Sequence, residues 1–345
     1  MKVEKKFSGI DQNDIADLLY DHFPGLMAGF YEMQSAFLSA RYKVHKSLET
    51  SNIIICFIRE VHLSIIRQRE KNLDHDISLD NFIENLNKIT IPTQKIVSVV
   101  SKTGIPKETV RRKIKQLMNT GFLLSENKKE YYWKLTTQKR SDFFIKVIKN
   151  DINMMAKFAF NISKYLNLNL NEKIIRDEIE SEFSFYFYHY LTCQLSWFKM
   201  WQDRIKDIDL ILITLQALIP TLQFIEKKKD LKQVGIDNLY SILGHANARY
   251  EGSNTAISAS SISEVTGIPR ATCIRKLIKL EKLGMLVRES KTKRYYVNQN
   301  SEGRTKYIMT KENVQITVLI FSEFLSIMLN ALMRNKKKEQ FSSTG

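Results

Sequence analysis

Cysteine, proline and glycine are scarce in this chain, whose 345 residues include 3, 5 and 12 of them. So few glycines and prolines leave little material for the turns of an all-strand protein, and a mainly helical fold is expected. Cys56, Cys193 and Cys273 stand far apart in apolar stretches and form no Cys-x-x-Cys pair. This spacing favours neither a disulfide framework nor a zinc site, and it fits a reducing compartment.

Motifs of nucleotide binding, hydrolysis and metalloprotease chemistry are also missing, and the six histidines form no His-x-x-x-His pair. We therefore expect no enzyme, no cofactor and no metal site. The first residues lack the apolar segment of a secretion signal, which predicts a cytoplasmic location. The apolar stretches Ile208–Ile225 and Val314–Met333 each contain polar residues, so we expect buried bundle or dimer helices and no membrane partner.

One segment of the chain occurs twice. Thr103–Lys134 recurs as Thr266–Val297 at an offset of 163 residues, with 13 identities in 32 ungapped positions. Solenoid repeats run to about 20 to 50 residues, so this period indicates duplication of a whole domain. Downstream, Lys149–Leu166 matches Lys311–Met328 at an offset of 162.

Upstream, Phe30-Tyr31 matches Phe187-Tyr188 at an offset of 157, which predicts a six-residue insertion in the second copy, within His245–Asn254. Each copy is long enough to bury its own core. The predicted organisation is an N-terminal tail (1–13), repeat one (14–171, with a helix-turn-helix at about 93–120 and a wing at 122–135), repeat two (172–333, with a helix-turn-helix at about 256–283 and a wing at 285–298) and a basic disordered tail (334–345).

Positive charge is concentrated in the repeated segment. The net charge is +16; residues 93–134 hold ten Lys and Arg against three Asp and Glu, and residues 256–297 hold nine against three. Charge gathered in two copies of one small motif is the footprint expected for binding a polyanion.

The motif itself predicts helix, turn, helix and hairpin. Gly104 suits a tight turn, Pro106 suits the first turn of a second helix, and Gly121 suits a left-handed cap at its end. At 100° per residue the side chains of Val110, Ile114 and Leu117 share one inward face. Copy two repeats this design with Gly267, Pro269, Cys273, Leu277, Leu280 and Gly284. Short strands at 122–124 and 131–133 would form the hairpin.

The outward face of the second helix and the hairpin tip carry the candidate DNA contacts. In copy one they are Lys107, Glu108, Thr109, Arg111, Arg112, Lys115, Gln116, Lys128 and Lys129. In copy two they are Arg270, Thr272, Arg275, Lys276, Lys279, Lys291, Lys293 and Arg294. Ile278 takes the place of Lys115, so the two copies are not equivalent as readers of DNA.

The residues T-G-I-P-[KR]-x-T-x-x-R-K, followed by a Gly-capped hairpin, resemble the winged-helix domains of bacterial transcription regulators. The long flanking helices are similar in layout to the MarR (multiple antibiotic resistance regulator) family, although the short wing, without D-x-R, is more like Crp-type or IclR-type wings. The resemblance implies a mainly α fold with small β wings, in which two duplicated domains form a single-chain pseudodimer. It further implies sequence-specific double-stranded DNA binding and transcription regulation, with the second helix in the major groove.

Two other functions remain open: a replication initiator with two winged helices, and a scaffold whose winged helices bind protein. Symmetric flanking helices favour the regulator. The aromatic run Phe183–Tyr190 would line a pocket for a small-molecule effector or pack in a core or dimer interface. Beyond DNA and an effector, we expect either a monomeric pseudodimer or further self-association of the chain.

Overall fold

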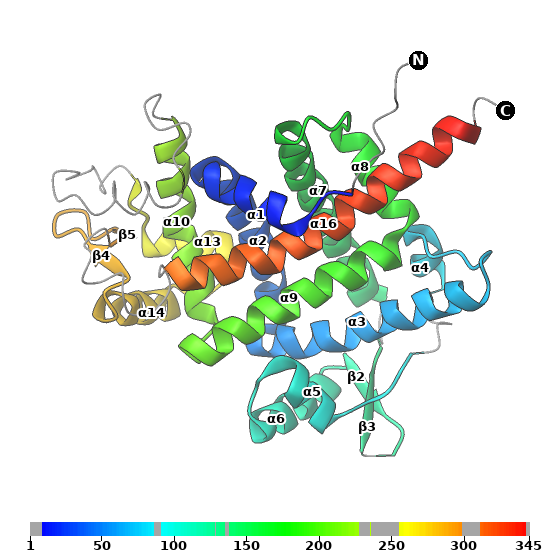
Figure 1. Ribbon diagram of the computed structural model, residues 1–345. Helices are drawn as coiled ribbons and strands as arrows, with labels where there is room; N and C mark the ends of the chain where they lie inside the picture. The colour runs from blue at the N-terminus through cyan, green and yellow to red at the C-terminus, as the bar shows by residue number, and fades with distance from the viewer. Residues whose placement is uncertain are drawn as a thin grey trace.

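A computed structural model describes residues 9–85, 91–127, 129–134, 138–227, 235, 255–298 and 311–342. The protein is mainly helical with two small sheets, as the composition predicts (Figure 1). The elements of the first half are α1 (Gln12–Asp21), α2 (Phe23–His45), α3 (Leu48–Lys71), α4 (Leu79–Glu84), β1 (Gln94–Lys95), α5 (Ile96–Thr103), α6 (Lys107–Asn119), β2 (Leu123–Ser125), β3 (Glu130–Trp133) and α7 (Gln138–Tyr165).

The second half follows a similar order. Its elements are α8 (Glu172–Ser181), α9 (Phe183–Ile205), α10 (Asp209–Lys227), α13 (Ala259–Thr266), α14 (Arg270–Lys282), β4 (Leu286–Arg288), β5 (Tyr295–Val297) and α16 (Lys311–Ser342). We call β1, α5, α6, β2 and β3 unit 1, and α13, α14, β4 and β5 unit 2. In Figure 1 unit 1 lies at the bottom and unit 2 at the left edge of the helical body.

Helix ends give the offset between the two halves. Side chains of Asp11 and Asn171 cap α1 and α8, because each accepts a backbone N–H of the first turn. Helices α2 and α9 both end at a left-handed lysine, Lys46 with φ 56° and Lys206 with φ 58°. Both pairs lie 160 residues apart.

Burial supports the same offset, since Gln34 and Gln194 are both fully buried. The match of Phe30 to Phe187 at an offset of 157 was therefore wrong by three residues, close to one helical turn. From these helices to the repeated motif the offset grows from 160 to 163, a net gain of three residues in the second copy. The predicted position of the insertion, His245–Asn254, lies outside the described residues.

The two halves pack against each other in a reciprocal pattern. Helix α2 packs on α10, and its counterpart α9 packs on α3; likewise α1 packs on α16, and α8 on α7. Contacts of this form, in which patch i meets patch j and patch j meets patch i, are those of a two-fold interface. The buried side chains form one continuous core that draws on both halves.

The C-terminal tail and the two most apolar helices belong to the helical body. The tail 334–345, expected to be disordered, is helical as far as Ser342, because α16 continues through it. Helices α10 and α16 are long and apolar enough to cross a membrane, but 67% and 50% of their most apolar windows are buried in the protein. Such burial is typical of the core helices of a globular protein.

Candidate nucleic-acid interface

The turn of each unit is held by a buried threonine. Oγ1 of Thr103 donates to the carbonyl oxygen of Val99 at 2.7 Å and accepts the N–H of Ile105 at 3.3 Å. In unit 2 the same two contacts join Thr266 to Ile262 and Ile268, at 2.6 and 3.2 Å. Gly104 and Gly267 have φ of 70° and 73°, which is the left-handed turn predicted for them.

The inward face of the second helix is as predicted in both units. Val110, Ile114 and Leu117 of α6 are at most 1% exposed, and Cys273, Leu277 and Leu280 of α14 are fully buried. Gly121 and Gly284, just past the helix ends, have φ of 68° and 70°. This buried face fixes which side chains of α6 and α14 face solvent.

On α6 the predicted contacts Lys107, Glu108, Arg111, Arg112, Lys115 and Gln116 are exposed, and Thr109 is half-buried. Arg111 forms an ion pair with Glu108 at 3.0 Å, so its charge is partly compensated. Among the described residues, no ion pair joins Lys107, Arg112 or Lys115 to an acidic side chain, and all three are exposed. These three cations are available on the outward face of α6.

On α14 the predicted contacts divide into two groups. Arg275 is exposed, and Arg270 Nε donates to Ser260 Oγ at 3.0 Å. Lys276, predicted as a contact, instead turns towards the helical body, where its Nζ lies 2.7 Å from Asp207 and 3.3 Å from Asp209 with 12% of its side chain exposed. Lys279 is half-exposed and lies 3.5 Å from Asp207, and Thr272 is half-buried.

Each hairpin is antiparallel, and β1 adds a strand that the sequence did not indicate. The sheet of unit 1 has the order β1-β3-β2, with Gln94 opposite Tyr131 and Leu123 opposite Trp133. In unit 2 Leu286 lies opposite Val297, so Trp133 corresponds to Val297 and the second hairpin is one residue longer. Lys129, Lys291, Lys293 and Arg294 are exposed at the tips, and Lys128 lies outside the described residues.

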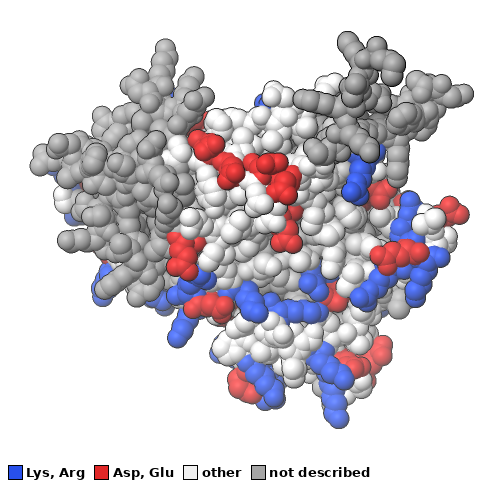
Figure 2. Space-filling view, in the orientation of Figure 1, with Lys and Arg blue, Asp and Glu red and all other residues white. Residues whose placement is uncertain are grey.

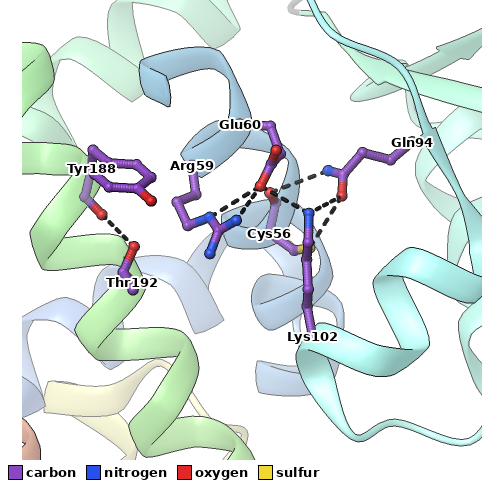
Figure 3. Close-up of polar contacts among 7 residues, drawn as sticks. All are labelled: Cys56, Arg59, Glu60, Gln94, Lys102, Tyr188 and Thr192. Carbon is purple, nitrogen blue, oxygen red and sulfur yellow. Dashed lines mark hydrogen bonds and ion pairs between the residues drawn. The ribbon is translucent and has the colours of Figure 1, made fainter. Parts of the chain in front are cut away.

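A polar network fastens unit 1 to the helical body (Figure 3). Lys102 Nζ on α5 donates to Glu60 Oε1 on α3 at 2.8 Å and to Gln94 Oε1 on β1 at 3.1 Å. Gln94 Nε2 donates to the carbonyl oxygen of Cys56 at 3.2 Å, and Arg59 also pairs with Glu60. Burial alone would raise the pKa of Glu60, but hydrogen bonds from Lys102 and Arg59 hold that pKa below its usual value. Lys102 therefore orients α5 and is not a free cation.

The N-termini of α3 and α10 meet between the two second helices. The N–H of Leu48 donates to Asp209 Oδ1 at 3.1 Å, and Lys113 Nζ of α6 donates to Ser47 Oγ at 3.2 Å. Since Asp209 also pairs with Lys276 of α14, a short polar chain connects α6 to α14 across the two halves. The two second helices are thus tied to the same point of the helical body.

Charge on the surface follows this arrangement. In Figure 2 the Lys and Arg side chains lie mostly in the lower half of the face shown, while a patch of carboxylates lies above them. No known protein family, curated protein or solved structure matches this chain.

Proposed function

We propose that this protein is a tandem winged-helix transcription regulator that binds double-stranded DNA as a single-chain pseudodimer. The observation that carries the proposal is the recurrence, in both halves, of a glycine turn followed by a helix whose outward face is basic. Arg112 and Lys115 on α6, and Arg275 on α14, are exposed on these faces. An apolar outward face would have favoured a purely architectural role.

In this proposal α6 and α14 enter the major groove, and the hairpins meet phosphates on either side. Exposed Arg112 and Arg275 are placed at equivalent positions, 163 residues apart, and each has the length to pair with guanine O6 and N7. Lys129 in the first hairpin, with Lys291, Lys293 and Arg294 in the second, would add sequence-independent attraction.

The reciprocal packing of α2 on α10 and α9 on α3 supports the pseudodimer. Because one chain then supplies both reading helices, it would occupy a whole operator without a partner chain. The heads differ, with Ile278 in place of Lys115 and Ala271 in place of Glu108, so the two half-sites would differ as well.

A role in binding protein is the alternative outside DNA binding. Both units expose apolar side chains: Val97 and Met118 in unit 1 are 67% and 37% exposed, and Val265 and Ile278 in unit 2 are 47% and 40% exposed. Exposed apolar groups of this kind would suit a protein partner, and they do not distinguish the two units. A replication initiator remains the alternative within DNA binding.

Salt dependence of binding to random duplex fragments tests the proposal. If about six to ten phosphates are neutralised, log K should fall against log salt with a slope of about −5 to −9. Sequencing of the fragments retained against competitor DNA then gives the operator. A DNA affinity that stays constant from low to physiological salt would exclude duplex DNA as the ligand. Binding to an acidic protein that is as tight as binding to duplex DNA would do the same.

A further inference from the structure

A cavity of about 510 Å³ lies between α2, α3 and α7 of the first half, α9 of the second half, and the base of the hairpin of unit 1. Its volume lies in the range of small-molecule sites, roughly 300 to 1,000 Å³. The walls are mainly aliphatic and aromatic, and Phe122, Trp133, Phe144 and Phe187 supply four rings. It reaches the surface beside Lys43 and Phe143, both exposed.

Part of the equivalent place in the second half is described. Positions 160 residues apart line both sites, and three of these pairs are Arg41 with Trp201, Ser51 with Ile211, and Ile55 with Leu215. Among the described residues the space beside Trp201 is about 10 Å³, and Trp201 is 4% exposed. The positions equivalent to Phe143, Phe144 and Val147 lie outside the described residues, so only the cavity of the first half is described in full.

The polar groups of the cavity indicate an uncharged occupant. Both terminal nitrogens of Arg41 bond to the buried carboxylate of Asp151, at 3.2 and 2.5 Å, so this cation is already neutralised. Burial, together with Arg41, lowers the pKa of His45 to about 4, and its imidazole is therefore neutral near pH 7. A neutral imidazole can donate one hydrogen bond or accept one.

Two contacts join the cavity to the two units. Phe122 and Trp133 belong to the hairpin of unit 1, and the rings of Trp133 and Phe144 lie 5.0 Å apart across the wall. Lys43 lies against Gly267 in the turn of unit 2, so close that a Cβ on Gly267 would be 2.5 Å from Lys43 Cγ. A molecule held here touches one unit directly and the support of the other.

We infer that this cavity binds one uncharged aromatic molecule of about two fused rings per chain, with a hydroxyl or similar group at His45, and that its binding alters DNA affinity. The second part rests on the proposed function. Coupling of this kind is reciprocal, so DNA and the aromatic molecule change each other's affinity by the same factor, on the order of fivefold or more.

Calorimetric titration of the full chain with 1-naphthol, and with the anion 1-naphthoate, tests the site. We expect one 1-naphthol per wild-type chain and at least tenfold weaker binding of 1-naphthoate. Val44→Trp and Ala40→Phe, which fill the cavity, should each weaken 1-naphthol binding at least tenfold. Tyr165→Trp, which adds an indole on an exposed part of α7 away from the cavity, should not.

Absence of 1-naphthol binding to the wild type, or unchanged binding in both filled variants while they keep their circular dichroism, would overturn the site. A further measurement, DNA affinity with saturating 1-naphthol, separates the two proposals. Binding of 1-naphthol without any binding of duplex DNA would remove the regulator and leave the site. DNA affinity that stays unchanged at saturation would remove the coupling alone.

Discussion

Lys43 of α2 lies over Gly267, the turn glycine of unit 2, whereas the equivalent Gly104 of unit 1 has Lys199 of α9 over it. In each case a helix from one half supports the turn of the other half, in keeping with the packing of α2 on α13 and of α9 on α5. The two supports differ in closeness. A Cβ added to Gly104 would lie 3.4 Å from Lys199 Cγ, whereas a Cβ added to Gly267 would lie only 2.5 Å from Lys43 Cγ.

We therefore expect Gly267→Ala to destabilise the protein more than Gly104→Ala. Both substitutions place an L side chain at positive φ, which costs about 1–2 kcal/mol. Only Gly267→Ala also forces Lys43 to move, and overpacking adds about 1 kcal/mol or more. Urea denaturation of both variants measures the difference, and equal losses would contradict a tight contact at Gly267.

Arg275 and Lys276 are neighbours on α14, and we expect the first to contribute to DNA binding and the second to the stability of the fold. Arg275→Ala removes an exposed side chain and should cost about 1–3 kcal/mol of DNA binding, with relaxed specificity at one base pair and little change in stability. Arg112→Ala should do the same for the other half-site. Lys276→Ala breaks the ion pairs with Asp207 and Asp209. It should lower the free energy of unfolding and leave the preference among DNA sequences nearly unchanged. Lys129→Ala, a control on the hairpin, should weaken binding to all DNA sequences by the same factor. An unchanged footprint for both Arg variants would show that α6 and α14 do not read bases.

The stability of the protein should fall in mild acid because of His62. This side chain is fully buried against Phe82, Phe183 and Phe187, and burial lowers its pKa to about 3. Between about pH 6.5 and pH 3 the unfolded chain binds a proton at His62 that the folded chain does not, so stability rises with pH across that window. Its contribution is complete above about pH 6.5. His62→Phe should flatten the curve by up to about 1.4 kcal/mol per pH unit, measured by denaturation at several pH values. A parallel pH profile for the variant would show that His62 carries no such linkage.

A single chain should occupy an imperfect inverted repeat whose half-sites lie about one helical turn, roughly 34 Å, apart. An electrophoretic shift experiment with a mixture of wild type and Arg275→Ala tests this. One of the two proteins carries a tag, so that its DNA complex migrates differently. A monomeric pseudodimer gives only two bound species, because each complex contains one chain. A third, intermediate species together with a perfectly palindromic footprint would show that two chains are required.

Local chemistry made the repeated motif predictable. The period of Val110, Ile114 and Leu117 fixed the inward face of α6, and the glycines at 104, 121, 267 and 284 marked turns that require positive φ. These features depend only on a few residues that are close in sequence, so the sequence was sufficient to predict them. The offset of the flanking helices was not predictable in the same way, because a slip of three residues along a helix keeps apolar side chains opposite apolar ones.

By itself the sequence determined a duplicated, basic helix-turn-helix motif with a hairpin, and a mainly helical chain around it. The tertiary structure decided the rest through contacts between residues distant in sequence. Strand β1 pairs Gln94 with Tyr131, and Lys276 turns to Asp207, 69 residues before it. The cavity beside Arg41 depends on how α2, α3, α7 and α9 pack in three dimensions, and no local pattern of the chain contains that information.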